Sequence, residues 1–209
     1  MKKGLDASVD LTRFASSLKA KGYDFAGRYY NINSPSKNLS LAEAHILSKV
    51  GLNIVAVWEN GFPTTTSYFN YAKGVHDGTS AYHYASEQIG QPGQTPIYFA
   101  VDFDASNADI NAIIQYFKGI QDAYNTISQN NPVYSIGVYG SGLVCSKVLD
   151  SNIATFAWLS QSSGWQGSGT FNNFNIKQGL DINECPELGG VNVDPDESPN
   201  DNEGSFLIS

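Results

Sequence analysis

The chain has 209 residues, of which 41% are hydrophobic and 15% are charged. This composition is typical of a globular domain with a substantial core and excludes a disordered chain. With 20 acidic and 12 basic residues, the net charge is −8. Nucleic acid and anionic membrane surfaces are therefore disfavoured as partners, and a mostly neutral substrate is expected.

No apolar run approaches the roughly 20 residues that span a bilayer. The basic start Met1-Lys2-Lys3 is not followed by the apolar segment of a signal peptide. We therefore expect a cytoplasmic protein, a mature form, or a cargo that is synthesised in the cytoplasm and exported without a cleaved signal to act in the periplasm or cell wall. Cys145 and Cys185 lie far apart in the sequence and are expected to be free thiols. We expect a monomer.

Strand-like and helix-like segments alternate along the chain. Apolar β-branched and aromatic runs indicate strands, and capped amphipathic segments indicate helices. In chain order the predicted elements are strand 3–7, helix 8–21, strand 24–31, helix 40–50, strand 53–59, helix 66–89 with a break near 74–78, strand 97–104, helix 108–127, strand 134–140, helix 141–149, and strands 155–161, 174–178 and 190–194.

Eight strands with helices between most of the earlier ones predict an α/β fold, a (β/α)₈ barrel that is degenerate in its last third. A doubly wound open sheet is the main alternative. We expect one domain at residues 1–196. The acidic, turn-rich segment 197–209 is expected to be a loosely ordered tail.

The fourth strand carries the most informative pattern. Residues 97–104 read IYFAVDFD, an apolar run that ends in Asp102 and Asp104. Side chains two residues apart on a strand point to the same face. Burying two carboxylates together is costly unless they are paired, hydrogen-bonded or used in catalysis, so the pattern favours a working site.

In a barrel, the carboxyl ends of all parallel strands meet on one face, where enzymes of this class place their active sites. The sequence brings to that face Asp6, Arg28, Tyr30, Glu59, Asp102, Asp104, Tyr139, Trp158, Gln161, Gln178 and Asp194. Glycoside hydrolysis needs one carboxylic acid to protonate the leaving oxygen and a second carboxylate as base or nucleophile. Such a cluster fits that requirement, and crowded negative charges raise the pKa of at least one member.

Several members have a structural alternative. Arg28 either contacts substrate or neutralises a buried acid such as Asp6 or Asp104. Trp158 is either a platform for a sugar ring or part of the core. Asp6 either takes part in the reaction directly or orients another residue. Gln178 and Asp194 either contact substrate or only close the last strands by hydrogen bonding.

Other chemistries have weaker support. HExxH and CxxC motifs are absent, so no transition-metal site and no cofactor are expected. An oxygen-only site for calcium or magnesium remains open in so acidic a cleft. The glycine-rich turn 137–142 lacks the lysine of a P-loop, and Ser141 lacks the GxSxG frame of a serine hydrolase.

A family resemblance covers residues 3–196. The motifs that carry it, in order, are GLD at 4–6, GRYY at 27–30, AVWE at 56–59, PIYFAVDFD at 96–104, GVYGSG at 137–142, AWLSQ at 157–161, and KQG followed by VNVD. Together they resemble the domain of unknown function 1906 group, glycoside-hydrolase-like (β/α)₈ barrels that are related in pattern to the family 25 lysozymes.

This resemblance implies a muramidase-like activity on peptidoglycan or another glycan. Family 25 lysozymes carry an Asp-x-Glu pair at the end of the fourth strand, with Glu as the general acid. The matching positions here are Asp102 and Asp104, so the Glu is shortened to Asp and Glu59 becomes a candidate to replace it. Asp6 matches the first-strand aspartate of the family, and Gln178 and Asp194 match its closing strands.

The sequence therefore predicts a glycosidase acting on bacterial cell-wall glycan, with Glu59 or Asp104 as acid and Asp102 as base, nucleophile or charge stabiliser. Asp6 and Arg28 would tune these groups, while Tyr30, Tyr139 and Trp158 would line the cleft. A toxin-like effector or phage lysin, with a delivery or immunity protein as a further partner, would fit. Two alternatives stay open: a non-catalytic glycan-binding barrel, and a phosphodiesterase-type barrel that holds a divalent cation.

Overall fold

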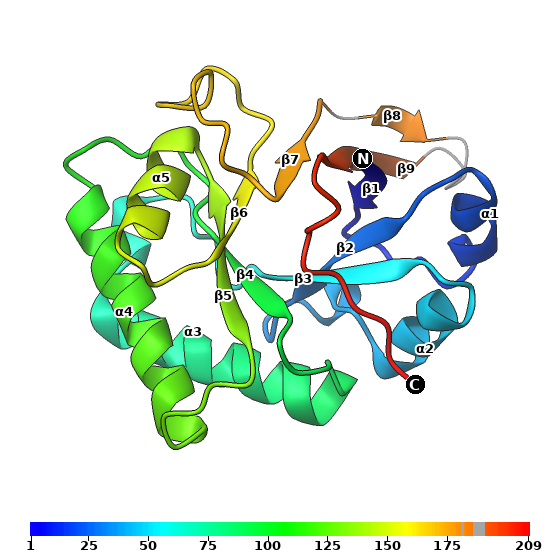
Figure 1. The fold of residues 1–209 in the computed structure, drawn as a ribbon, viewed down its shortest axis with the longest axis horizontal. Coiled ribbons are helices and arrows are strands. Elements are labelled where there is room, and N and C mark those ends of the chain that lie inside the picture. Colours follow the sequence, from blue (N-terminus) through cyan, green and yellow to red (C-terminus); the bar gives the residue numbers. More distant parts are fainter. Residues whose placement is uncertain (181, 186–190) are drawn as a thin grey trace.

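The computed structural model describes residues 1–180, 182–185 and 191–209. Its centre is a closed barrel of eight strands, in which the last strand is hydrogen-bonded to the seventh and to the first (Figure 1). The barrel strands are β1 (Lys2–Asp6), β2 (Phe25–Tyr30), β3 (Asn53–Trp58), β4 (Pro96–Ala100), β5 (Ser135–Gly140), β6 (Phe156–Leu159), β7 (Ile176–Gln178) and β9 (Val191–Ser198). A further strand, β8 (Ile182–Cys185), pairs with β9. The predicted barrel is confirmed, and closure excludes the open sheet.

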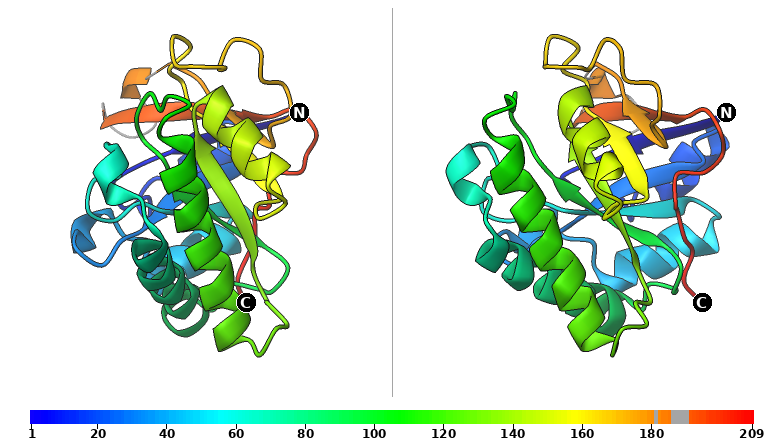
Figure 2. Two further views of the ribbon diagram at one scale, coloured as in Figure 1. Left: turned by 90° about the vertical axis from the view of Figure 1, so that its left-hand side faces the viewer. Right: turned by 60° about the vertical axis from the view of Figure 1, so that its left-hand side comes forward.

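Helices connect the first six strands and cover the outside of the barrel (Figures 1 and 2). They are α1 (Ala15–Ala20), α2 (Leu41–Lys49), α3 (Tyr71–His83), α4 (Ile110–Ile127) and α5 (Gly142–Asp150), with short 3₁₀ turns η1 (Pro35–Lys37) and η2 (Thr66–Tyr68) and a π-helical turn η3 (Tyr84–Ile89) after α3. In the described residues no helix follows α5, so the last third is degenerate, as predicted.

The predicted break near residues 74–78 does not occur, because α3 runs without interruption from Tyr71 to His83. Its glycines serve close packing against α4. A Cβ atom at Gly74 would overlap the backbone carbonyl of Tyr116, and one at Gly78 would lie 2.9 Å from the Cα of Ile120. Glycine therefore lets these two helices approach closely.

Side chains along the barrel strands alternate between two apolar layers. One set fills the barrel interior and includes Phe25, Val57, Tyr98 and Trp158. The other set faces the helices and forms the larger core. Both layers are buried, so a strand is apolar on both faces and its sequence alone does not show which face points inward.

The last barrel strand differs from the prediction in direction and length. Residues 190–194 were expected to form a final parallel strand, whereas β9 runs from Val191 to Ser198 and is antiparallel to both of its neighbours in the barrel. Asp194 still reaches the same end of the barrel, because it pairs with Asp6.

The segment after β9 crosses the end of the barrel at which the parallel strands begin. Ile54 and Phe206 exchange two backbone hydrogen bonds of 2.8 and 2.9 Å. Lys2 Nζ lies 2.7 Å from Glu203 Oε1, and the hydroxyl of Tyr98 donates to the carbonyl of Glu203 at 2.9 Å. The prediction of a loosely ordered tail is wrong, because Glu203 and Phe206 are buried against the barrel.

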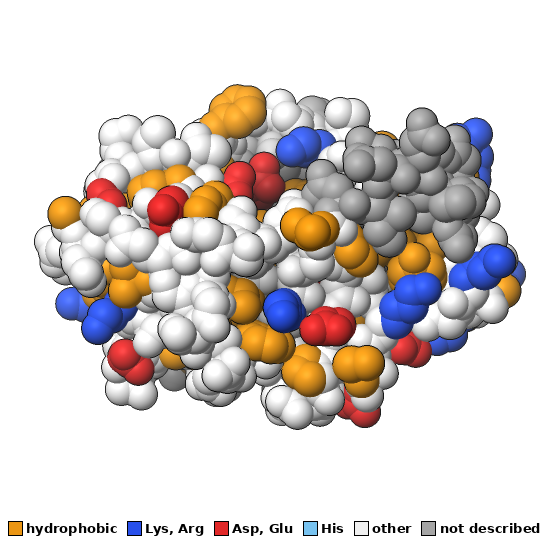
Figure 3. Space-filling model, turned by 90° about the horizontal axis from the view of Figure 1, so that it is seen from above, with side chains coloured by type: hydrophobic (Ala, Val, Ile, Leu, Met, Phe, Trp, Pro, Cys, Tyr) orange, Lys and Arg blue, Asp and Glu red, His pale blue; other side chains and the backbone are white. Residues whose placement is uncertain are grey.

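On the face seen from above, hydrophobic side chains of the described residues reach the surface singly or in small groups (Figure 3). None of the helices in the described part of the chain combines the length and apolar character needed to cross a bilayer. Cys145 is a buried free thiol, whereas the prediction for Cys185 falls outside the side chains that the structure describes.

Candidate functional site

A cleft of about 190 Å³ opens at the end of the barrel where the parallel strands finish. It is lined by Asp6, Tyr29, Val57, Glu59, Ala100, Asp102, Tyr139, Trp158, Gln161, Gln178 and Asp194. The structure thus brings together eight of the eleven residues that the sequence places at this face and leaves out Arg28, Tyr30 and Asp104.

Gln178 joins the first and last strands of the barrel inside the cleft. Its Nε2 donates to Asp6 Oδ2 at 2.7 Å and to Asp194 Oδ2 at 3.1 Å. Its Oε1 accepts from the hydroxyl of Tyr139 at 2.8 Å and from the backbone N–H of Gln161 at 3.2 Å. Asp6 Oδ1 also accepts from the hydroxyl of Tyr29 at 2.9 Å, so its carboxylate is held in one orientation.

Glu59 and Asp102 follow the adjacent parallel strands β3 and β4. Burial raises the pKa of both carboxyl groups, and the charge of Asp102 raises the pKa of Glu59 further. Lys37 opposes both shifts, with its Nζ 3.5 Å from Glu59 Oε1. A carboxyl group that keeps its proton above the usual pH range is suited to general acid catalysis.

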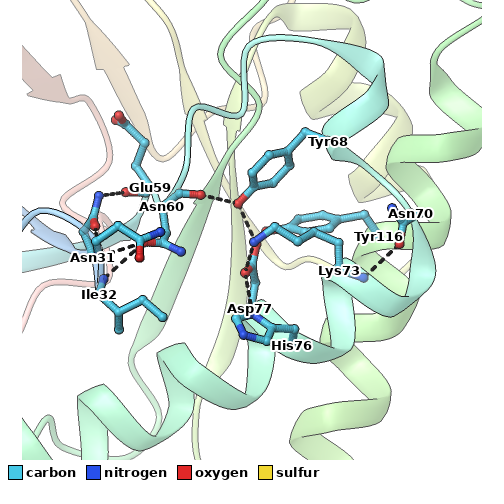
Figure 4. A network of polar contacts seen from close by, with 11 residues as sticks. Asn31, Ile32, Glu59, Asn60, Tyr68, Asn70, Lys73, His76, Asp77 and Tyr116 are labelled. Carbon is cyan, nitrogen blue, oxygen red and sulfur yellow. Dashed lines mark hydrogen bonds and ion pairs between the residues drawn. The ribbon is translucent and has the colours of Figure 1, made fainter.

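The chain around Glu59 is anchored by a network of polar contacts (Figure 4). Asn31 Nδ2 donates to the carbonyl of Glu59, and Asn60 Oδ1 accepts from the N–H of Ile32 at 3.2 Å. The hydroxyl of Tyr68 lies 2.6 Å from the carbonyl of Asn60 and 2.7 Å from Oδ2 of the buried Asp77. These contacts tie the end of β3 to the loop after β2 and to helix α3, so Glu59 projects from a fixed support.

Trp158 and Asp196 lie deeper in the barrel. Trp158 is 1% exposed, and its Nε1 donates to Asp196 Oδ1 at 2.9 Å. Burial, followed by the charge of Asp6, raises the pKa of Asp196 well above its usual value. Trp158 therefore belongs to the floor of the cleft and to the interior packing, with only a small exposed area for a ligand.

Arg28 does not reach the cleft. It is fully buried on the helix-facing side of β2, where its Nε lies 2.8 Å from Glu43 Oε1 and its Nη2 lies 3.1 Å from Glu43 Oε2. Its Nη1 also donates to the carbonyl of Ala7. The expected substrate contact is wrong, and the acid that Arg28 neutralises is Glu43, not Asp6 or Asp104.

Tyr30 also faces the helices, where it is fully buried and its hydroxyl donates to Gln91 Oε1 at 2.8 Å. Because side chains alternate along a strand, the inward residue between Arg28 and Tyr30 is Tyr29. Sequence reasoning missed Tyr29. Gly27 lies two residues earlier on the same face, which the structure shows to be the barrel interior, because a Cβ there would lie 2.6 Å from the ring of Trp158.

Asp104 is exposed and lies outside the cleft. Strand β4 ends at Ala100, so the alternation that would place residues 102 and 104 on one face does not extend to Asp104. Its Oδ1 instead accepts from the backbone N–H of Gln166 at 2.8 Å, in the loop between β6 and β7. The expected shared face for Asp102 and Asp104 is therefore wrong.

Among the residues that the structure describes, no group of three or more His, Cys, Asp and Glu side chains is arranged to hold a metal ion. The polar groups that line the cleft are carboxyl, amide and phenol groups. Burial raises the pKa of Tyr29 and Tyr139 well above 10, and the charge of Asp6 raises both further. Both hydroxyls therefore stay protonated and act as hydrogen-bond donors.

Comparison with known proteins gives a family and a fold. A family model described as an Rv2525c-like, glycoside hydrolase-like domain matches residues 16–194. The protein FadG of Bacillus subtilis (strain 168) is 35% identical over 160 residues, which cover 74% of this chain and 27% of FadG. The chain thus spans little more than a quarter of the length of that relative.

Two solved structures share the barrel. The Tat-secreted protein Rv2525c of Mycobacterium tuberculosis, in complex with L-tartrate, matches with a TM-score of 0.79 at 22% identity and covers 98% of both chains. A muramidase from Acremonium alcalophilum matches with a TM-score of 0.55 at 13% identity, over 96% of this chain and 95% of the muramidase. At these identities the likeness shows the fold alone.

Proposed function

The chain belongs to the Rv2525c-like, glycoside hydrolase-like domain family, and we propose that its cleft hydrolyses glycosidic bonds in bacterial cell-wall glycan. The observation that carries the proposal is the placement of Glu59 and Asp102 on adjacent strand ends of one cleft, both with a raised pKa. Glycoside hydrolysis uses such a pair, in which one carboxyl group carries a proton and the other is ionised.

In the proposed mechanism Glu59 is the general acid. Its proton passes to the glycosidic oxygen as the bond from that oxygen to the anomeric carbon breaks. Asp102 supports attack at the anomeric carbon, either as the nucleophile or by accepting the proton of the attacking water. Asp6, held by Tyr29 and Gln178, is a positioning residue that keeps a negative charge facing the developing positive charge of the sugar.

The two solved structures that share the barrel support a cell-wall substrate and a site of action outside the cytoplasm. The muramidase from Acremonium alcalophilum shares the barrel, and Rv2525c is described as Tat-secreted. Export of this chain would bring the cleft to the glycan.

The test is release of soluble fragments from purified peptidoglycan, measured by mass spectrometry. We expect Glu59→Gln to slow release by about 10²–10⁴-fold, because it removes the proton donor, and Asp102→Asn to slow it by a similar factor. Glu87→Gln and Asp150→Asn are matched controls on exposed helical positions and should release fragments at the wild-type rate. The wild-type rate should fall as the pH rises through the raised pKa of Glu59, because the acid then loses its proton.

One observation favours a second function, that of a glycan-binding barrel without turnover. Asp104, at the position where the resemblance places the general acid, lies outside the cleft. If the wild-type protein sediments with peptidoglycan but releases nothing, and Glu59→Gln binds equally well, this second function replaces hydrolysis. Disaccharide-peptides released by the wild type alone would exclude it.

A further inference from the structure

Lys37 brings an ammonium group to the edge of the cleft. Its Nζ lies 3.5 Å from Glu59 Oε1 and 5.3 Å from the ring centroid of Tyr29, and both of these residues line the cleft. The side chain of Lys37 is 38% exposed, so it remains accessible from solvent. In the proposed hydrolysis by Glu59 and Asp102 this cation has no role as a reacting group.

The chain that carries Lys37 is held against the end of β2. Lys37 is the last residue of the turn η1, and its N–H donates to the carbonyl of Ser34 at 3.0 Å. The next residue, Asn38, forms an isolated β-bridge with Tyr29, and the N–H of Leu39 donates to the carbonyl of Tyr29 at 3.0 Å. The backbone therefore fixes where the lysine side chain begins, while its flexible methylene stem lets the ammonium group move.

The contact between Lys37 and Glu59 is weak enough to be exchanged for another. Its length of 3.5 Å exceeds the roughly 2.7–3.2 Å of a close N–H···O hydrogen bond. Ion pairs between partly exposed side chains contribute little free energy, because water screens them. An ammonium group also has three N–H donors. A carboxylate on a bound molecule can therefore take Lys37 from Glu59 at small cost.

An anionic substrate needs such a cation, because the cleft itself is acidic. The carboxyl groups that line it belong to Asp6, Glu59, Asp102 and Asp194. Like charges placed together cost free energy, so the cleft repels a sugar carboxylate unless a cation meets it there. A neutral sugar has no such requirement. The position of Lys37 therefore favours a substrate with a carboxylate group close to the bond that is cleaved.

Moving Lys37 away from Glu59 also changes the state of the general acid. Burial raises the pKa of Glu59, Lys37 opposes that shift, and the charge of Asp102 adds to it. Tyr29 and Tyr68 also face Glu59, but burial raises the pKa of both hydroxyls, so they stay neutral. Glu59 therefore takes up a proton more readily once Lys37 pairs with a different carboxylate.

We propose that Lys37 binds a carboxylate group of the substrate and, by leaving Glu59, allows Glu59 to take up from water the proton that it then donates. The proposal rests on the proposed hydrolysis and names its substrate class, a glycan with an acidic sugar beside the scissile bond. Lys37 is then a specificity-determining residue. An acidic sugar both binds more tightly than a neutral one and prepares the general acid.

Two monosaccharides without a glycosidic bond isolate the effect of the carboxylate. They are N-acetylmuramic acid and its primary amide, which differ in charge and hardly in shape. NMR titration of the wild-type protein measures the affinity for each, and the ¹³C shift of the Glu59 carboxyl group measures its pKa with and without ligand. We expect the acid to bind at least about tenfold more tightly than the amide, because charge-assisted hydrogen bonds are the stronger ones. The acid should also raise the pKa of Glu59, and the amide should not.

Substitutions of lysine show whether Lys37 carries both effects. Lys37→Met removes the charge and keeps the length of the side chain. It should abolish the preference for the acid, and the pKa of Glu59 should be higher than in the wild type before any ligand is added. Lys37→Arg should retain the preference. Lys118→Met makes the same change in net charge at an exposed position of α4 and should behave as the wild type.

Equal affinities for the acid and the amide, or a preference that survives Lys37→Met, would overturn the carboxylate site and leave fragment release by the wild type intact. A preference for the acid with an unchanged pKa of Glu59 would overturn the link to the general acid. A preference that depends on Lys37, in a protein whose wild type releases no fragments, would uphold the site and overturn hydrolysis.

Discussion

At the residue scale, Asp196 shows how burial in the barrel interior changes the pKa of a carboxyl group. It is 3% exposed, its Oδ1 accepts from Trp158, and its Oδ2 is buried without a hydrogen-bond partner among the described residues. Burial, followed by the nearby charge of Asp6, raises its pKa well above the usual value. In the unfolded chain the same group titrates near pH 3.9. Because the folded state holds this proton more tightly, Asp196 makes the fold less stable as the pH rises above about 4.

We therefore expect Asp196→Asn to raise the melting temperature at pH 7. The direction follows from the raised pKa, because ionisation of the buried carboxyl group at pH 7 costs free energy in the folded state alone. At pH 3 the carboxyl group is protonated in both states and the gain should vanish. Calorimetry at both pH values measures the change in melting temperature, with the exposed Asp150→Asn as control. An equal gain at both pH values would show that the effect is not electrostatic.

At the scale of the elements, the pair of Arg28 and Glu43 fastens three segments together. Arg28 comes from β2, Glu43 from α2, and the loop after β1 joins through the carbonyl of Ala7 and the N–H of Leu11, which donates to Glu43 Oε1 at 2.8 Å. Both charged side chains are fully buried. A buried pair of this kind gives little net stability as a whole, but removing one partner leaves the other charge without compensation.

Glu43→Gln should lower the free energy of unfolding by about 3–5 kcal/mol, measured by urea denaturation. Glu87→Gln, which alters an exposed pair with His83 on a helical surface, should cost less than about 1 kcal/mol. If Arg28 contacted substrate instead, Glu43→Gln would leave stability unchanged and would raise KM for the glycan.

At the scale of the whole molecule, the barrel has one closed and one open end. The C-terminal segment closes the end where the strands begin, through Glu203 and the backbone pairing of Phe206 with Ile54. The cleft occupies the opposite end. In Figure 1 the terminal segment runs past β3 to the C-terminus. The stabilising contacts of the terminal segment and the proposed active site therefore lie at opposite ends of the same strands, as is usual for this fold.

Phe206→Ala should destabilise the protein by about 3–5 kcal/mol, because the ring is 4% exposed and its removal leaves a cavity. The neighbouring Leu207→Ala, at a position that is 42% exposed, should cost less than about 0.5 kcal/mol. Urea denaturation of both variants measures the difference. Equal losses would mean that the segment is held by its backbone pairing and not by burial of Phe206.

The amino-acid sequence by itself determined the elements and most of the cleft. Apolar runs and caps indicated the strands and helices, and the cap at Ser40 is confirmed by the hydrogen bond from the N–H of Glu43 at 3.1 Å. Because parallel strands all finish at one end of a barrel, acids at strand ends had to meet there. Asp6, Glu59 and Asp102 do so.

Only the tertiary structure decided which face of each strand points inward, where each strand stops and how the chain closes. Strand β2 is buried on both faces, so its pattern did not distinguish Tyr29 from Arg28 and Tyr30. Because β4 ends at Ala100, Asp104 points away from the cleft. The position of this strand end depends on contacts with neighbouring strands and loops. The direction of β9 and the burial of the terminal segment likewise depend on pairings between residues almost 200 positions apart, such as Lys2 with Ser198. Local sequence does not encode such pairings, because their free energy comes from surfaces that exist only once the barrel has formed.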